Sequence, residues 1–418
     1  MITLRPVAHA LVPVDSAAAG AVSAPNYDEF QSDVEVWEHL QQRPRSVLGV
    51  TMAHCATPSV EEIGIGDSSE SLERAGANFA ALASTGLVRK ASDILWVYEI
   101  DDRARSGVCQ IGIGGYALTG EIRTPEVPDG SIIRNEGVRE KKAKGRADLI
   151  AACGAFIGTV NNAVEDESGA LVEALRAVAD ARPPDLEVAD EAGTLHRVWI
   201  VEAAQDIERF RALLAAEPHA FVADGNHRSQ AAVMLGSEVF LAVFFPAGQL
   251  AIQPYNRLVK DAGDLGEAFE AAVGERFEID DPATGSAEPY QPTEPLEIGL
   301  YRPGRGWLRL RPRPGTYDPT NAVEVLAADV VQRNLFSAVL GIHEAGDPRL
   351  TFVGANRDAA WLQGQVDGGR AQLAVTLPAV SMDEFMEVCR QNRMMPPKST
   401  WFVPKIRSGL VMGVFGEP

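Results

Sequence analysis

The residues best suited to chemistry lie together at 224–229, where a carboxylate, a glycine, a histidine and an arginine follow closely. Residues 220–223 before them form a short apolar run typical of a buried strand, and apolar residues recur at helical spacing from Ala231 onward. The pattern predicts a strand-to-helix turn at Gly225. Such a turn lets backbone N–H groups approach a ligand, and the start of a helix carries a partial positive charge.

These groups suit an anion, above all a phosphate. His227 and Arg228 place two donor or cationic side chains beside the turn, and the planar fork of arginine matches phosphate oxygens. The alternative is a plain turn in which Asp224 caps the helix and the two polar side chains are solvated. The sequence leaves both interpretations open. A phosphate site here would be formed by Gly225, Asn226, His227, Arg228 and Ser229.

A second unusual stretch, residues 395–410, lies near the C-terminus. Prolines are interspersed there with cations, hydroxyls and two adjacent aromatic residues, and prolines hold a segment extended at low entropic cost. Polar groups would then face a ligand in a fixed order. The other interpretation is a terminal strand on the core with Lys398 and Lys405 exposed, and the choice stays open. The candidate contacts to substrate or phosphate are Lys398, Ser399, Thr400 and Lys405.

Glu136 precedes the basic run Lys141, Lys142, Lys144 and Arg146. Cations gathered where a helix begins can hold phosphate or can simply solvate that face of the helix. For the run alone, the solvated face is the simpler interpretation. A lone glutamate in a loop is usually exposed too, so the residues by themselves give Glu136 no special role.

The sequence around the other glycine, cysteine and histidine patterns does not support a known binding motif. Residues 112–117 superficially match a dinucleotide fingerprint, but that fingerprint must open a helix, and Pro125 and Pro128 follow in a polar passage. A glycine-containing strand edge is the better interpretation. The cysteines have no C-x-x-C pairing, which predicts neither a zinc site nor a disulfide framework. The histidines outside the 224–229 segment also lack ligand-like spacing, and they are His9, His39, His54, His196, His219 and His343.

The composition of the whole chain is that of a soluble globular protein. Its 418 residues predict two or three folding units, with 46% hydrophobic and 23% charged residues. The 38 Lys and Arg residues against 58 Asp and Glu residues give a net charge of −20, which repels nucleic acid and anionic lipid. Neither nucleic acid nor membrane is expected as a partner. A cytoplasmic location is expected, and the sequence does not set the oligomeric state.

Helix and strand patterns alternate along much of the chain, which predicts an α/β (α+β) protein. Strands are expected at residues 46–52, 94–100, 198–201 and 239–245, and helices at 73–87, 146–157 and 323–340. An acidic, proline-rich passage near 261–295 marks the main boundary. The predicted organisation is an N-terminal α/β layer at 1–110, a core at 111–260 that contains the 224–229 turn, and a C-terminal α/β domain at 261–418.

Three segments together resemble the domain of unknown function 1015 family: residues 24–28, 223–228, and 395–400 continuing to 408–410. That family looks related to the ParB and sulfiredoxin superfamily and to free serine kinases of the same fold, which convert serine into O-phosphoserine. The resemblance implies a ParB/sulfiredoxin-like core that binds a nucleotide, ATP or ADP, with Mg²⁺. It also implies that the C-terminal tail returns to the cleft of this core.

The resemblance implies roles for individual residues. Asn135-Glu136 looks like the His-Glu pair of the kinases, whose glutamate takes the proton of the serine hydroxyl, so Glu136 is the candidate base. Asp224 becomes a metal or substrate contact, and His227 joins these two in the catalytic group. Asp28 and Asn135 are further candidate contacts to substrate or phosphate.

Two departures from the family pattern bear on function. The family usually has histidine where this chain has Asn135 and Asn226, and both changes remove a titratable group while keeping a hydrogen-bonding one.

The predicted function is a nucleotide-dependent phosphotransferase resembling a free serine kinase. One alternative is a nucleotide-sensing protein without turnover. Another is a ParB-like DNA-binding protein, which the net charge of −20 argues against.

Overall fold

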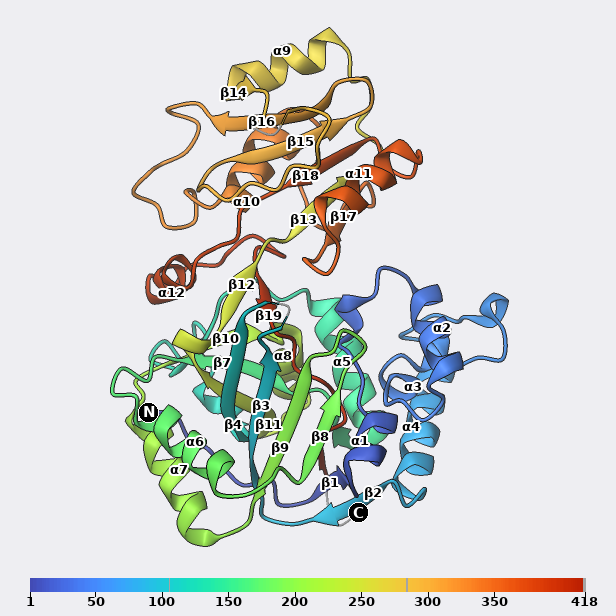
Figure 1. The fold of residues 1–418 in the computed structure, drawn as a ribbon, viewed down its shortest axis with the longest axis vertical. Helices are drawn as coiled ribbons and strands as arrows, with labels where there is room; N and C mark the ends of the chain where they lie inside the picture. Colours follow the sequence, from blue (N-terminus) through green and yellow to red (C-terminus); the bar gives the residue numbers. More distant parts are fainter. Residues whose placement is uncertain (105, 283–284, 416–418) are drawn as a thin grey trace. The chain divides into compact units, whose positions relative to one another are not determined.

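The computed structural model describes residues 1–104, 106–282 and 285–415 (Figure 1). It is a mixed α+β protein with several sheets, as the sequence predicted. The chain divides into two compact units, each described here by itself. The first consists of Met1–Arg134, Val138–Leu250 and Val403–Pro418, and the second of Asn135–Gly137 and Ala251–Phe402.

The first unit contains a sheet of eight strands in the order β5-β10-β7-β11-β4-β3-β9-β8. The β10–β5 and β11–β7 pairs are parallel and the other neighbours are antiparallel. The strands are β3 (Leu95–Asp102), β4 (Val108–Leu118), β5 (Ile132–Arg134), β7 (Val160–Val164), β8 (Leu186–Ala189), β9 (Leu195–Val201), β10 (Ala220–Asp224) and β11 (Val239–Pro246).

The glycine-rich segment at 112–117 lies inside β4, in the interior of this sheet. Glycine is required there because of packing: a Cβ on Gly114 would lie 2.0 Å from the Trp96 ring, and one on Gly115 would lie 2.6 Å from Leu4. The segment opens no helix, which confirms that it is not a dinucleotide fingerprint.

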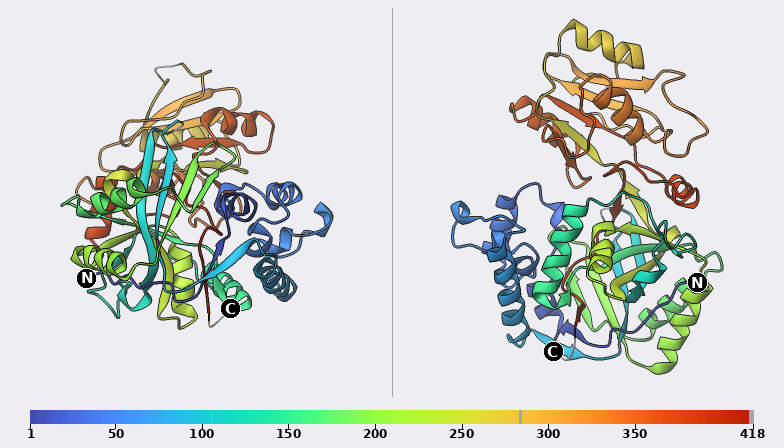
Figure 2. Two further views of the ribbon diagram at one scale, coloured as in Figure 1. Left: turned by 60° about the horizontal axis from the view of Figure 1, so that its bottom comes forward. Right: turned by 180° about the vertical axis from the view of Figure 1, so that it is seen from behind.

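Helices cover the first unit, and the apolar faces of the N-terminal helices pack together in a largely helical core. In the view from behind, the N-terminal helices lie beside α5 (Figure 2). The helices are α1 (Ser16–Val22), α2 (Asp33–Gln42), α3 (Leu48–Thr51), α4 (Ser69–Ala83), α5 (Glu140–Cys153), α6 (Ala170–Ala181), α7 (Ala204–Ala216) and α8 (Asn226–Met234). A small sheet joins them, in the order β2 (Val88–Ala91), β1 (Ala10–Pro13), β20 (Met412–Val414) and β6 (Ala155–Phe156).

The strand predicted at residues 46–52 is wrong, because this segment forms α3. Its apolar residues do enter a core, with Val47, Leu48 and Val50 nearly fully buried. The core is made by helices, and the short run of apolar residues could not distinguish a buried strand from one buried helical turn. The Val47 N–H donates to the Val22 carbonyl at 2.8 Å, which fixes the start of the turn.

The second unit contains a six-stranded antiparallel sheet in the order β14-β16-β15-β18-β13-β17. The strands are β13 (Asn256–Val259), β14 (Phe277–Asp280), β15 (Ile298–Arg302), β16 (Gly306–Pro312), β17 (Leu350–Val353) and β18 (Leu373–Thr376). A separate pair consists of β12 (Ala251–Gln253) and β19 (Trp401–Val403). The helices are α9 (Glu267–Arg276), α10 (Ala327–Val330), α11 (Ala359–Asp367) and α12 (Met382–Arg390).

The helix predicted at 323–340 is shorter and less regular than expected. It consists of α10 and a π-helical continuation at Val331–Ser337, both packed into the core of the second unit. Within the described parts of the chain, no helix is both long enough and apolar enough to cross a bilayer.

Candidate functional site

The strand-to-helix turn predicted at Gly225 is confirmed. β10 ends at Asp224, Gly225 has a φ of +107°, and α8 begins at Asn226. Only glycine adopts this backbone conformation without strain. β10 lies between β5 and β7, so the turn stands on an inner strand of the large sheet. The first turn of α8 therefore presents its N–H groups from a rigid base, which is the geometry of an anion site.

Arg228 folds back over this turn. Its Nη2 lies 3.1 Å from Asp224 Oδ1, and its Nη1 donates to the Thr159 carbonyl. Two glycines leave room for the side chain, because a Cβ on Gly225 would lie 3.0 Å from Arg228 Nε and one on Gly158 would lie 3.2 Å from Arg228 Cδ. The guanidinium thus lies directly against the turn, where it can meet an anion bound at the helix start.

Lys405 from the tail supplies a second cation to the turn. Its Nζ lies 2.9 Å from Asp224 Oδ2 and 3.8 Å from Asp28 Oδ2. The three side chains are mostly buried, with exposures of 10% for Lys405, 19% for Asp224 and 13% for Asp28. The exposed position that one interpretation of the tail gave Lys405 is therefore wrong.

The same pairing bears on the predicted metal role of Asp224. One carboxylate oxygen of Asp224 accepts from Arg228 and the other from Lys405. A Mg²⁺ ion prefers oxygen ligands that are not already neutralised by cations, and it would have to compete with the Lys405 ammonium. The present arrangement does not fit a metal bound directly to Asp224, and that role stays a prediction.

The other loop residues contribute mainly to the backbone framework. His227 Nε2 accepts the Arg139 N–H at 3.2 Å, as a neutral imidazole does. Ser229 is fully buried; its hydroxyl donates to the Asn226 carbonyl at 3.0 Å and accepts from Arg134 Nε at 3.3 Å. The Ser229 hydroxyl thus holds the first turn of α8 together, and its predicted contact with phosphate is untested.

Arg134 is a residue of this site that the sequence patterns did not identify. It ends β5, and its Nη1 donates to Gln230 Oε1 of α8 at 2.6 Å. Burial lowers the pKa of Arg134 to about 10. Among the described residues its Nη2 has no hydrogen-bond partner. An arginine after two isoleucines carried no signal in the sequence, because only the parallel pairing of β5 with β10 brings it beside α8.

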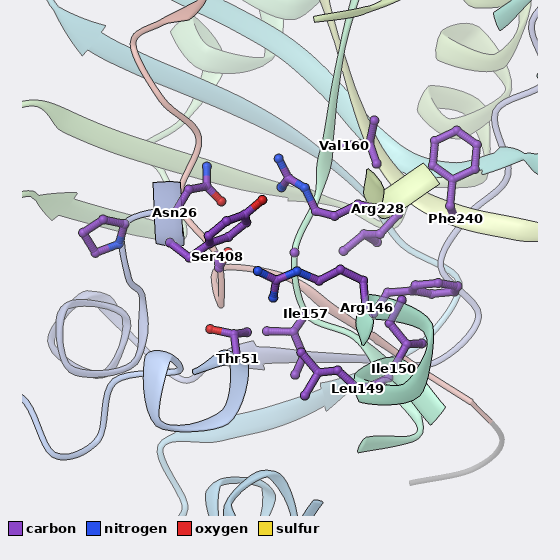
Figure 3. Close-up of a pocket in the computed structure, with 16 residues that line it drawn as sticks. Asn26, Thr51, Arg146, Leu149, Ile150, Ile157, Val160, Arg228, Phe240 and Ser408 are labelled. Atoms are coloured by element: carbon purple, nitrogen blue, oxygen red, sulfur yellow. The ribbon is translucent and has the colours of Figure 1, made fainter. Parts of the chain in front are cut away.

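A small pocket with a volume of about 60 Å³ adjoins the loop, and Arg228 lines it. Figure 3 shows the guanidinium groups of Arg146 and Arg228 pointing toward Asn26 and Ser408. The guanidinium of Arg146 stacks 4.1 Å from the centre of the Tyr27 ring. The apolar wall is formed by Leu149, Ile150, Ile157, Val160, Phe240 and Leu241.

The basic residues at 141–146 lie in two different environments. α5 begins at Glu140, six residues earlier than predicted, so the whole run lies on the helix. Lys141 and Lys144 are exposed and form ion pairs with Asp67 and Asp148, as the solvated-face interpretation predicted. Arg146 instead lines the pocket. One member of the run is therefore available to a ligand.

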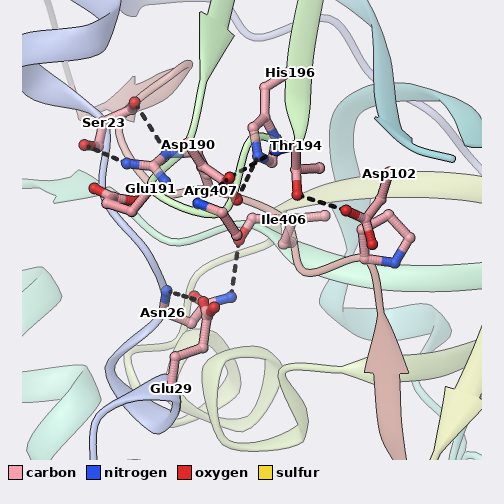
Figure 4. Close-up of polar contacts among 12 residues, drawn as sticks. Ser23, Asn26, Glu29, Asp102, Asp190, Glu191, Thr194, His196, Ile406 and Arg407 are labelled. Carbon is pink, nitrogen blue, oxygen red and sulfur yellow. Dashed lines mark hydrogen bonds and ion pairs between the residues drawn. The ribbon is translucent and has the colours of Figure 1, made fainter. Parts of the chain in front are cut away.

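Buried polar contacts hold the tail in the first unit (Figure 4). Arg407 Nη1 lies 3.1 Å from Glu191 Oε2, and its Nε donates to Ser23 Oγ at 3.2 Å. The Arg407 N–H donates to the Tyr98 hydroxyl, which lies 2.8 Å from His196 Nδ1. Burial lowers the pKa of His196, so this imidazole is neutral near pH 7.

A second contact links the tail to the N-terminal segment that carried part of the family resemblance. Asn26 Nδ2 donates to the Ile406 carbonyl at 2.9 Å, and the Asn26 N–H donates to Glu29 Oε1 at 2.8 Å. Burial, aided by the charge of Asp28, raises the pKa of Glu29 to about 7. These contacts flank Lys405 and fix the position of its ammonium beside the loop.

Glu136 belongs to the second unit, together with part of the tail. The Met395 N–H donates to the Asn135 carbonyl at 2.8 Å, and the Lys398 N–H donates to Glu136 Oε2 at 3.4 Å. Lys398 Nζ lies 5.1 Å from the centre of the Tyr255 ring. Glu136 and Lys398 are thus neighbours, and their roles toward a substrate stay predictions.

The two other tail candidates also lie in the second unit, and Ser399 is turned inward. It is buried and donates to the Pro396 carbonyl at 2.6 Å, whereas Thr400 is half-buried. The loop residues 224–229 and Lys405 belong to the first unit. A cleft shared by both sets of residues stays a prediction.

Comparison with known proteins identifies a family. A family model described as "Protein of unknown function (DUF1015)" matches residues 4–335, which confirms the family predicted from the sequence. No curated protein matches the chain.

Several solved structures are similar to this chain at low identity. A free serine kinase in complex with AMP is 14% identical, with a TM-score of 0.36, over 67% of this chain and 89% of the other. A conserved hypothetical protein from Pyrococcus furiosus is 13% identical, with a TM-score of 0.38, over 66% and 89%. SbnI with a C-terminal truncation, from Staphylococcus aureus, is 13% identical, with a TM-score of 0.36, over 67% and 83%. With TM-scores this low, the likeness carries no conclusion about the function of this chain.

Proposed function

The chain belongs to the DUF1015 family of proteins of unknown function, and we propose that it is a nucleotide-dependent phosphotransferase acting on free serine or a similar small hydroxy amino acid. The proposal includes a ParB/sulfiredoxin-like core around the turn at Gly225. It takes its phosphate site from residues 224–228 and its acceptor chemistry from the sequence resemblance of Glu136 to the base of the free serine kinases.

The observation that carries the proposal is the position of Arg228. This side chain lies against the turn at the start of α8 and also lines the adjoining apolar pocket. A nucleotide needs that combination, because its phosphates require donors and positive charge while its base requires an apolar, stacking surface. Tyr27 with its stacked Arg146 supplies an aromatic face with a cation beside it.

In the proposed reaction the acceptor hydroxyl attacks the terminal phosphorus of the nucleotide. Glu136 takes the hydroxyl proton, the new O–P bond forms, and the bond between the terminal phosphoryl group and the nucleotide breaks. The shortened nucleotide leaves with the electron pair of that bond. Arg228 and the start of α8 stabilise the charge on the departing phosphate. Mg²⁺ bound to the phosphates would neutralise part of the same charge.

A second candidate function is nucleotide binding without turnover. It is favoured by the pairing of Asp224 with both Lys405 and Arg228, which leaves this carboxylate already neutralised. The resemblance also places a histidine where this chain has Asn135, and an amide does not accept or release a proton near neutral pH as an imidazole does.

One assay separates the two. The full chain is incubated with Mg²⁺, ATP or ADP labelled in the terminal phosphate, and a panel of amino acids including serine. A phosphotransferase transfers the label to one or a few hydroxy amino acids. Saturable nucleotide binding without any labelled product would select the binding function. Absence of binding by any nucleotide, measured by calorimetry, would contradict both.

A further inference from the structure

A cluster of three potential metal ligands lies in the N-terminal helical part of the first unit, formed by Asp33, His54 and Cys55. One ligand atom from each lies within 4.8 Å of the others, and Asp33 Oδ1 is 3.4 Å from His54 Nε2. Asp33 is the first residue of α2, and the other two belong to the 3₁₀ turn Ala53–Cys55. The cluster uses none of the residues of the proposed nucleotide site.

The elements that carry these ligands are fixed to one another. Trp37 Nε1 of α2 donates to the Thr57 carbonyl at 3.0 Å, which ties the helix to the segment after the turn. The Gly64 N–H donates to the His54 carbonyl at 3.0 Å. A Cβ on Gly66 would lie 3.2 Å from His54 Cε1, so the imidazole packs closely against this loop. The ligand atoms are therefore already gathered before any ion binds.

We propose that Asp33, His54 and Cys55 form a site for a zinc-type divalent cation, bound through Oδ1, Nε2 and Sγ. A thiolate and an imidazole favour zinc or a related transition metal, whereas Mg²⁺ and Ca²⁺ favour oxygen ligands alone. Two ligand atoms bound to zinc at about 2.0–2.1 Å with tetrahedral angles lie about 3.3 Å apart. The 3.4 Å separation of Asp33 Oδ1 and His54 Nε2 matches this value.

Three protein ligands leave one coordination position for water or an added ligand. Access to the site is from the side of Asp33, whose side chain is 52% exposed, since His54 and Cys55 are buried. On binding, the Cys55 thiol releases its proton to solvent and the S–metal bond forms without a change in oxidation state. The site should thus exchange its ion with solution, and the ion should tie the start of α2 to the turn.

Sequence patterns do not predict this site, because a His-Cys pair and an aspartate twenty-one residues before the histidine match no common ligand spacing. Burial raises the pKa of the Cys55 thiol to about 12, with the Asp33 charge adding to the effect. The thiol is therefore protonated in the metal-free protein. The cluster depends on the fold, which brings the start of α2 to a turn later in the chain.

The test uses the full chain, first dialysed against a chelator and then titrated with Co²⁺ and Zn²⁺. One equivalent of Co²⁺ should produce a thiolate-to-cobalt charge-transfer band and the intense visible bands of a four-coordinate ion, and one equivalent of Zn²⁺ should abolish both. A large excess of Mg²⁺ should leave them unchanged. Absence of the charge-transfer band would overturn the proposal.

Substitutions of single residues test which side chains bind the ion. Cys55→Ser should remove the charge-transfer band, and Asp33→Asn should weaken Zn²⁺ binding at least tenfold. Because Asp33 is half-exposed, Asp33→Asn should fold even if the Cys55 variant does not. The matched control is Cys153→Ser, which alters a half-buried thiol outside the cluster and should bind Zn²⁺ as the parent does. Equal Zn²⁺ affinity for the parent and Asp33→Asn would show that the Asp33–His54 contact is only an ion pair.

Discussion

Lys405 Nζ lies 2.9 Å from Asp224 Oδ2, although 181 residues separate the two in the sequence. The C-terminal tail thus provides the cation that pairs with the carboxylate at the end of β10. Both side chains are mostly buried, at 10% and 19% exposed, so solvent screens this pair less than a surface ion pair. Loss of one partner would leave the other charge in a poorly solvated position.

Replacing Lys405 by Met should therefore lower the free energy of unfolding by about 1–3 kcal/mol. Asp224→Asn should cost at least as much, because Lys405 and Arg228 then both lose a partner. The double variant should be less unstable than the sum of the single effects, because the Lys405 ammonium is no longer left without Asp224. Urea denaturation of all four proteins measures this coupling. Lys144→Met serves as a control, since its pair with Asp148 is more exposed and should contribute less than about 0.5 kcal/mol. Strictly additive effects would show that Lys405 and Asp224 do not stabilise each other.

Arg228→Ala should weaken nucleotide binding about 10–100-fold, the loss of one or two charge-assisted hydrogen bonds to phosphate. Arg228→Lys should recover only part of this loss, because an ammonium lacks the planar fork. Calorimetric titration with ATP and ADP measures both affinities. Arg211→Ala removes an exposed arginine that pairs with Glu208 and should bind nucleotide like the parent. If all three variants bind equally well, Arg228 does not contact the nucleotide.

Gly225→Ala should both destabilise the protein and weaken nucleotide binding. An alanine at a φ of +107° is strained, and its Cβ would lie 3.0 Å from Arg228 Nε, which must then move off the turn. The expected loss in unfolding free energy is about 1–3 kcal/mol. Gly154→Ala is the matched control, since Gly154 has a φ of +62° and a Cβ added there would meet nothing within 4 Å. That control should show a smaller loss of stability and unchanged nucleotide affinity.

The local pattern of the loop was predictable, because all of its signals lie within a dozen residues. An apolar strand, a glycine and a helical repeat specify β10, the turn and α8 without help from the rest of the chain. The same holds for the glycine-rich β4, which was correctly separated from a dinucleotide fingerprint. The strand prediction is wrong at α3, because a helix of only four residues is too short to show a helical period.

The parts of the site that depend on long-range contacts were not predictable from sequence patterns. Arg134 reaches α8 only because β5 pairs with β10. Arg146 lines the pocket while Lys141 and Lys144 form exposed ion pairs, although all three lie on α5. Spacing along the sequence does not contain that information, since it is set by sheet order and helix packing.

Glu136→Gln should abolish phosphoryl transfer and leave nucleotide affinity within about threefold of the parent. The amide keeps the size and a hydrogen-bonding oxygen of the carboxylate but cannot accept the substrate proton at neutral pH. Product formation and calorimetric binding are measured on the same preparation. Glu140→Gln, an exposed change at the start of α5, should retain activity. Full activity of the Glu136 variant would remove this residue from the mechanism and leave the phosphate site unaffected.

Glu29 should make the stability of the first unit depend on pH between about 4.5 and 7. Burial, followed by the charge of Asp28, raises its pKa from 4.5 to about 7, so the folded protein keeps a proton that the unfolded chain releases in this range. Folding then binds protons, and stability that is fully present below pH 4.5 is lost as pH rises through 7. Glu29→Gln removes this dependence, because the amide can still accept the Asn26 N–H but never ionises.

The variant should therefore gain stability relative to the parent by about 1–3 kcal/mol between pH 5 and pH 8, with no further gain above pH 8. Urea denaturation of both proteins across this range measures the difference. Glu61→Gln, an exposed change in the same N-terminal region, should follow the parent at every pH. Parallel curves for the parent and Glu29→Gln would mean that Glu29 is ionised in the folded protein throughout, with Lys405 outweighing the effect of burial.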